Sequence, residues 1–65
     1  MREIREMSSS KSEAIGMGRR LCARHGQIVL VVDCPKAIPR RYYVVDEQTY
    51  ADEFCGLPIV LTCKA

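Results

Sequence analysis

Tryptophan is absent from this sequence, and phenylalanine and histidine each occur once in its 65 residues. Long apolar runs are absent as well, since the longest aliphatic stretch is residues 28–32. A helix that crosses a membrane needs about 20 apolar residues, and segment 1–7 lacks the apolar region of a secretory signal. We therefore expect a cytoplasmic protein that does not enter a membrane and whose cysteines are reduced thiols.

The chain is short enough to restrict its function. We expect one domain, 1–65, in which residues 1–9 are a loose N-terminal extension. A domain of about 60 residues buries only about 60% of its unfolded surface, so an enclosed pocket would consume most of the core. The sequence also contains no Gly-x-Ser-x-Gly nucleophile motif. These absences predict a protein that is not an enzyme and that holds no cofactor.

The net charge of +2 is unevenly distributed along the chain. Residues 1–41 contain nine basic and four acidic side chains, whereas residues 42–65 contain one basic and four acidic side chains. Such an asymmetry favours surfaces of opposite sign, and charged surfaces act mainly by steering and orienting partners.

A helix is expected in the first half of the chain. Ser10 and Glu13 have the spacing of a capping box, and Gly26 is a typical left-handed stop. The residues between them that recur at helical spacing predict the buried stripe: Ala14, Met17, Gly18, Leu21, Cys22 and His25. Because Gly18 lies on this stripe, we expect the helix backbone to approach the sheet closely there.

Three strands and a second helix are expected in the remainder. The strands are residues 27–33, 40–45 and 57–63, and a short helix capped by Asp46 covers residues 47–55. Strand 27–33 is aliphatic without alternation, which is typical of a central strand buried on both faces. The short loop after it predicts antiparallel pairing with strand 40–45, and the helix before strand 57–63 permits a parallel crossover.

Together these elements predict an α+β fold with the element order α-β-β-α-β. The small three-stranded, mainly antiparallel sheet has the strand order 2-1-3 and packs against the one long helix, with a second short helix. Strand 40–45 is then an outer edge, through which the otherwise monomeric chain could form a weak homodimer.

Two charged sets are candidate contact surfaces. Basic side chains suited to phosphate or to an acidic partner are Arg19, Arg20 and Arg24 on the first helix and Arg40 and Arg41 beside two tyrosines. Acidic side chains on or before the second helix are Asp46, Glu47, Asp52 and Glu53. The acidic set could imitate phosphates or dock on an arginine-rich partner.

The cysteines offer a further alternative. Cys22 and His25 have the spacing of half a zinc site, which Cys34, Cys55 and Cys63 could complete. Cys55 and Cys63 are not a close pair, however, so we favour separate small thiols over bound metal.

Two resemblances to known families accompany these patterns. The segments 12–14, 28–30 and 43–50 resemble short antitoxins of bacterial toxin–antitoxin pairs, which implies a transcriptional regulator that binds nucleic acid. In size and plan, the whole chain resembles small phage-encoded inhibitors of host defence of the anti-CRISPR type. That resemblance implies a protein of the host cytoplasm that obstructs a nucleoprotein complex.

We therefore expect a non-enzymatic protein-interaction module, encoded by a phage or another mobile element, that blocks a host defence nucleoprotein complex through charged surfaces. The alternatives are a small nucleic-acid-binding or antitoxin-like regulator that uses the basic helix, and a zinc-stabilised mini-domain.

Overall fold

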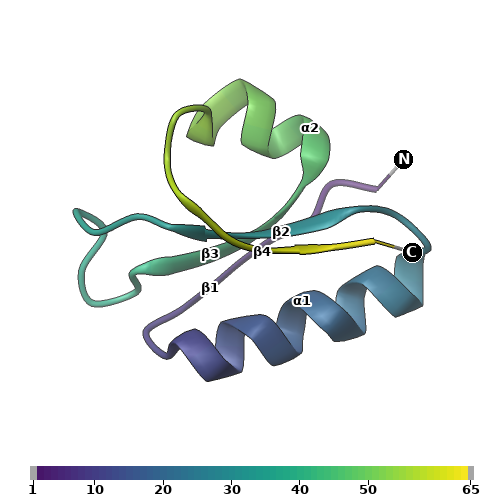
Figure 1. The fold of residues 1–65 in the computed structure, drawn as a ribbon, viewed down its shortest axis with the longest axis horizontal. Helices are drawn as coiled ribbons and strands as arrows, with labels where there is room; N and C mark the ends of the chain where they lie inside the picture. The colour runs from purple at the N-terminus through teal and green to yellow at the C-terminus, as the bar shows by residue number, and fades with distance from the viewer. Residues whose placement is uncertain (1, 65) are drawn as a thin grey trace.

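Residues 2–64, which a computed structural model of the protein describes, form three layers (Figure 1). Helix α1 (Lys11–His25) lies on one face of a four-stranded antiparallel sheet. A shorter helical segment, α2 (Glu47–Thr49) followed by the π-helical turn η1 (Tyr50–Phe54), lies on the other face. The strands are β1 (Arg5–Ser8), β2 (Val29–Asp33), β3 (Tyr42–Asp46) and β4 (Ile59–Cys63), in the order β1-β3-β2-β4. The α+β class is confirmed.

The described sheet contains four strands, so the prediction of three was wrong. The additional strand is β1, which pairs antiparallel with β3, placing Arg5 opposite Val45 and Met7 opposite Tyr43. It lies within segment 1–9, which we expected to be loose, and it covers the side of β3 that we expected to be an outer edge. The pattern was missed because β1 is only four residues long and its first three residues are exposed, so apolar alternation is absent.

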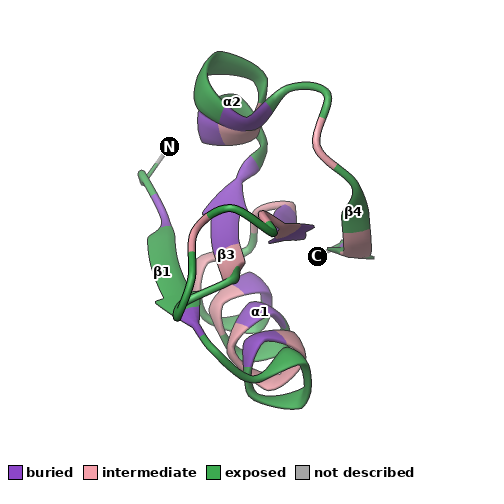
Figure 2. Ribbon diagram, turned by 90° about the vertical axis from the view of Figure 1, so that its left-hand side faces the viewer, coloured by how far each residue is buried: buried purple, intermediate pink, exposed green. Residues whose placement is uncertain are grey.

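The other three strands follow the predicted order, with β2 between β3 and β4 and antiparallel to both. The uninterrupted aliphatic sequence of β2 is explained by its position, because both faces of this strand are covered. Val29 and Val31 pack on the α1 side, whereas Leu30 and Val32 pack on the side of η1. Figure 2 shows the buried residues gathered between the two helical layers.

Helix α1 begins and ends where the sequence predicts. The hydroxyl of Ser10 accepts a hydrogen bond from the backbone N–H of Glu13 at 3.3 Å. Gly26 has φ 62° and donates its N–H to the carbonyl of Cys22 at 2.9 Å. A glycine relieves the strain that a Cβ atom would suffer in this left-handed conformation.

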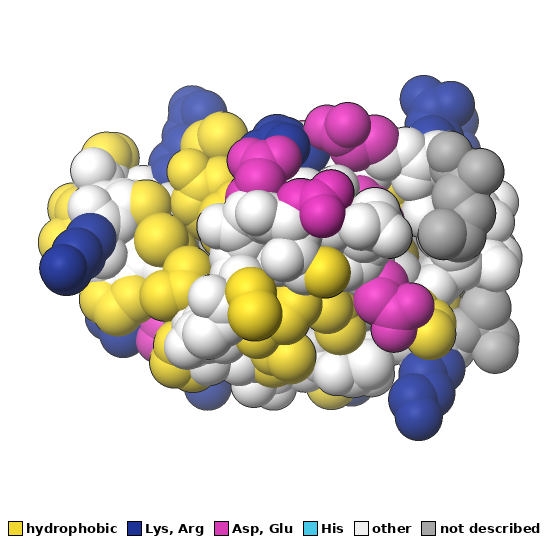
Figure 3. Space-filling view, turned by 90° about the horizontal axis from the view of Figure 1, so that it is seen from above, with side chains coloured by type: hydrophobic (Ala, Val, Ile, Leu, Met, Phe, Trp, Pro, Cys, Tyr) yellow, Lys and Arg dark blue, Asp and Glu magenta, His cyan; other side chains and the backbone are white. Residues whose placement is uncertain are grey.

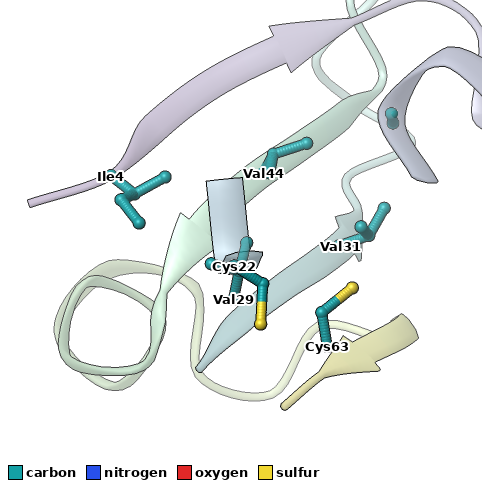
Figure 4. Close-up of a cluster of buried hydrophobic side chains, with 7 residues drawn as sticks. Ile4, Cys22, Val29, Val31, Val44 and Cys63 are labelled. Carbon is teal, nitrogen blue, oxygen red and sulfur yellow. The ribbon is translucent and has the colours of Figure 1, made fainter. Parts of the chain in front are cut away.

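Gly18 brings α1 into close contact with β2, as the sequence predicts. A Cβ atom at Gly18 would lie 3.0 Å from Cγ2 of Val31 and 3.5 Å from Sγ of Cys63. Glycine therefore permits a helix–sheet distance that any side chain would increase. The core cluster on this side of the sheet, drawn in Figure 4, includes Ile4, Cys22, Val29, Val31, Val44 and Cys63.

The second helical segment is less regular than the expected helix 47–55. Only Glu47–Thr49 is α-helical, and the wider η1 turn follows. Phe54 is buried with its ring centroid 4.9 Å from that of Tyr43, and the hydroxyl of Tyr50 donates to the carbonyl of Leu57 at 3.0 Å. None of the helices in the described part of the chain is long and apolar enough to span a membrane.

Candidate interaction surface

Asp46 belongs to the core, so the prediction that it is part of an exposed acidic patch was wrong. Only 4% of its surface is exposed. Its carboxylate accepts hydrogen bonds from the backbone N–H of Ile4 and of Thr49, both at 3.1 Å, and from the Thr49 hydroxyl. Burial alone would raise the pKa of Asp46, but these hydrogen bonds outweigh it and hold the pKa below its ordinary value. Asp46 thus caps α2 and joins it to the N-terminal segment.

Glu53 forms an ion pair with Arg5. The guanidinium of Arg5 on β1 donates two hydrogen bonds to its carboxylate, one of them 2.8 Å long. These bonds lower the pKa of Glu53. Two members of the predicted acidic set, Glu47 and Asp52, remain exposed without an ion pair to any residue of the range 2–64. Figure 3, seen from the α2 side, shows acidic side chains over this layer.

The basic residues of α1 form a larger free surface. Arg19, Arg20 and Arg24 are all exposed, and none forms an ion pair with another residue between positions 2 and 64. The sequence contains no acidic residue between Glu13 and Asp33. The outer face of α1 is therefore cationic along its second half, and the sheet separates it from the acidic layer of α2 and η1.

Two shallow grooves flank α1 and divide its arginines. The groove towards β1, of about 430 Å³, is bordered by Arg24 and Leu21 and by Glu3 and Glu6. A smaller hollow beside it is bordered by Arg20, Arg24 and Glu6. The groove towards β4, also of about 430 Å³, is bordered by Arg19. The three arginines thus form a ridge between two hollows. We call Arg19, Arg20 and Arg24 the arginine ridge.

The basic residues after β2 do not join this ridge as a pair. Arg41 is held by Asp33 through hydrogen bonds of 2.6 and 2.9 Å, and its guanidinium lies 5.7 Å from the ring centroid of Tyr42. These hydrogen bonds lower the pKa of Asp33 and raise that of Arg41. Arg40 is exposed in the same loop, near Ile38, whose surface is 78% exposed. Of Arg40 and Arg41, only Arg40 remains available to bind a partner.

The cysteines lie in separate environments. Cys22 and Cys63 are buried near one another between α1 and β4, whereas Cys55 is exposed and Cys34 lies at the start of a loop. Burial, followed by the neighbouring Cys22, raises the pKa of the Cys63 thiol. No group of three histidine, cysteine or acidic side chains within residues 2–64 is arranged to hold a metal ion. The described residues therefore provide no zinc site that Cys22 and His25 could begin.

Comparison with known proteins adds no relative: no family model, curated protein or solved structure matches this chain. The assignment of a site consequently depends on chemistry alone. The arginine ridge can bind phosphates and carboxylates, since a guanidinium donates hydrogen bonds in pairs to the oxygens of either group. The sequence identified all members of this ridge, but it did not reveal Arg5 as the partner of Glu53, because β1 itself was missed.

Proposed function

We propose that this protein is a non-enzymatic inhibitor that binds a host defence nucleoprotein complex through the arginine ridge of α1. One observation supports the proposal above others. Arg19, Arg20 and Arg24 are exposed within six residues and are not paired with any acidic side chain in the range 2–64. Surface arginines that form no ion pair attract a partner of the opposite sign and accelerate its association.

The arginine ridge is preferred to the acidic set because fewer acidic side chains are free. Asp46 is buried, and Glu53 is paired with Arg5. The two exposed carboxylates of Glu47 and Asp52 make a small surface for phosphate mimicry, and Asp52 accepts a hydrogen bond from Gln48 at 3.0 Å. We assign these two residues a secondary, orienting role in binding.

A nucleoprotein complex suits the ridge because it presents phosphates and carboxylates on one surface. Arginine recognises both groups through paired hydrogen bonds. The chain has principal extents of 29 × 23 × 15 Å, so it could obstruct a nucleic-acid channel without an enclosed site of its own. This mode of action is the one implied by the resemblance to phage-encoded inhibitors of host defence of the anti-CRISPR type.

The proposal is tested by inhibition of purified complexes. A panel of RNA-guided defence complexes is incubated with the protein, and binding of labelled target DNA to each complex is measured by gel shift. We expect at least one complex to lose target binding at a stoichiometric concentration of protein. Unimpaired target binding by every complex of the panel would overturn the proposed function.

Direct nucleic-acid binding is the second candidate, because the same arginines could contact phosphates of free DNA or RNA, as in an antitoxin-like regulator. A salt titration separates the two functions. For binding to duplex DNA, the logarithm of the affinity falls with that of the salt concentration by a slope of about 0.9 per phosphate contacted. A shift of naked nucleic acid with a slope of about 3 favours the regulator, whereas the inhibitor requires the protein component of the complex.

A further inference from the structure

Two of the four cysteines lie in the same part of the core. Cys22 on α1 and Cys63 on β4 are 4% and 8% exposed, and both belong to the cluster between the helix and the sheet (Figure 4). Neither takes part in a disulfide bond. Cys34 and Cys55 lie outside this cluster, after β2 and after η1. Within the core, the pairing that the fold offers is therefore that of Cys22 with Cys63.

Gly18 explains why the two thiols approach each other. A Cβ atom at Gly18 would lie 3.5 Å from Sγ of Cys63, so this sulfur atom rests against a turn of α1 that carries no side chain. Cys22 follows Gly18 by one helical turn and is buried on the same side of α1, and the Cβ positions of such residues are about 5–6 Å apart. Because helical side chains lean towards the N-terminus, the thiol of Cys22 leans towards the turn at which the sulfur of Cys63 lies.

Both thiols also border one groove. This hollow of about 430 Å³ between α1 and β4 is lined by Cys22 and Cys63 together with Arg19 and Lys64. It gives a small solute a route to both sulfur atoms, although little of either residue is exposed. Burial and the neighbouring Cys22 raise the pKa of the Cys63 thiol, whereas Arg19 opposes that rise. Since a raised pKa disfavours the reactive thiolate, oxidation of the pair should be slow and should require a persistent oxidant of small size.

We propose that Cys22 and Cys63 form a reversible oxidation site, at which hydrogen peroxide converts the two thiols into one disulfide bond between α1 and β4. The Cys63 thiolate attacks a peroxide oxygen, which breaks the O–O bond, releases hydroxide and leaves a sulfenic acid on Cys63. The Cys22 thiolate then attacks this sulfur atom, forms the S–S bond and displaces a second hydroxide. Overall, two thiols lose two electrons and two protons, and the peroxide is reduced to two molecules of water. An external dithiol reverses the reaction by exchange.

The disulfide would change the stability of the fold. It would join α1, near the middle of the chain, to β4 at its end, and a bond that closes a long loop stabilises a protein chiefly by restricting its unfolded state. It would also tie the helix that carries the arginine ridge to an outer strand of the sheet. The proposal needs no binding partner, so it is independent of the proposed function and is tested separately from it.

Peptide mapping tests the site. The variant Cys34→Ser/Cys55→Ser, which changes only cysteines outside the core cluster, is treated in its native state with excess hydrogen peroxide and digested without reduction. Mass spectrometry should find the peptides of Cys22 and Cys63 linked, with their combined mass less two hydrogen atoms, in a protein that remains monomeric on a non-reducing gel. Dithiothreitol should restore both thiols. Thiols that stay free, cysteines oxidised singly to sulfinic or sulfonic acid, or links between different chains would each overturn the proposal.

Thermal unfolding shows whether the native fold accommodates the bond. The oxidised Cys34→Ser/Cys55→Ser protein should melt about 10 °C or more above its reduced form, because the loop that is closed is long. Adding Cys22→Ala or Cys63→Ala should abolish this increase. These two matched variants also control for peroxide damage to methionine, which affects all the proteins alike. A linked protein that melts at or below the temperature of its reduced form would show that the bond arises only in a distorted or unfolded chain, and would overturn the proposal.

Discussion

The carboxylate of Asp46 accepts a hydrogen bond of 3.1 Å from the backbone N–H of Ile4, a residue 42 positions earlier in the chain. The backbone N–H of Asp46 in turn donates to the carbonyl of Ile4 at 3.1 Å. The same carboxylate caps α2 through Thr49. One buried acidic residue therefore fastens the N-terminal segment, the end of β3 and the start of α2 to each other.

Replacement of Asp46 should destabilise the fold strongly. Asp46→Ala removes a helix cap and leaves the N–H of Ile4 without its side-chain acceptor, which together cost about 2–4 kcal/mol. A loss of this size is a large part of the stability of a small domain. Urea denaturation followed by circular dichroism measures it. A loss below about 1 kcal/mol would show that Asp46 is not the junction described here.

The stability of the protein should fall in acid, and Asp46 should account for part of that loss. Because the pKa of Asp46 is lowered in the folded state, its contribution is complete above its unfolded pKa of about 3.9 and disappears as the pH falls through the folded pKa. Asp46→Asn should therefore lose less stability than the wild type between about pH 5 and pH 2. Equal losses in both proteins would assign the acid sensitivity to Asp33 and Glu53, whose pKa values are also lowered.

The two glycines of α1 should respond oppositely to alanine. Gly18→Ala places a methyl group 3.0 Å from Val31, a fully buried side chain, so we expect a destabilisation of about 1–3 kcal/mol. Gly16→Ala meets only the flexible end of Arg20 at 3.5 Å and should stabilise the helix by up to about 1 kcal/mol. Thermal unfolding of both variants measures the difference. A stabilising Gly18→Ala would contradict the close helix–sheet contact.

The ion pair between Arg5 and Glu53 should hold β1 against η1. Arg5→Glu is expected to lower the melting temperature, because it places a carboxylate beside those of Glu53 and Glu3, both of which accept hydrogen bonds from Arg5. The exchanged double variant Arg5→Glu/Glu53→Arg should recover the part of the loss that comes from Glu53. The recovery should shrink in about 1 M salt, since salt screens exposed charges. If the double variant melts no higher than Arg5→Glu, the pairing seen between these side chains does not contribute to stability.

The thiols should differ in reactivity according to burial. Cys55 is exposed, whereas Cys22 and Cys63 are 4% and 8% exposed, and burial raises the pKa of Cys63. An aromatic disulfide reagent should modify Cys55 first and reach Cys22 and Cys63 only after denaturation. Cys55→Ser should remove the fast phase. Rapid modification of Cys63 in the native protein would contradict its burial beneath α1.

Much of this fold could be predicted from local patterns. The aliphatic run of β2 indicated a strand covered on both faces, and Ser10 and Gly26 marked the ends of α1 because caps have local sequence rules. β1 could not be recognised, since a short outer strand needs no apolar alternation. Its backbone groups are satisfied by β3, which lies far away in sequence.

The charged surfaces were only partly predictable for a related reason. A sequence shows where charges occur but not which of them meet in the folded chain. Asp46 was correctly predicted as a cap and wrongly counted as exposed. Arg19, Arg20 and Arg24 were placed correctly, because helical spacing alone separates them from the buried stripe of α1.

The affinity of the arginine ridge for its complex is the most direct measure of whether this surface carries the inhibition. Arg19→Glu/Arg20→Glu/Arg24→Glu is compared with Glu47→Lys/Asp52→Lys by biolayer interferometry against the complex that the wild type inhibits. A loss of about 1 kcal/mol per arginine predicts affinity weaker on the order of 100-fold for the first variant. The second variant should bind within about fivefold of the wild type, as peripheral charges affect affinity weakly. Equal affinity of the arginine variant and the wild type would show that the protein does not bind through the arginine ridge.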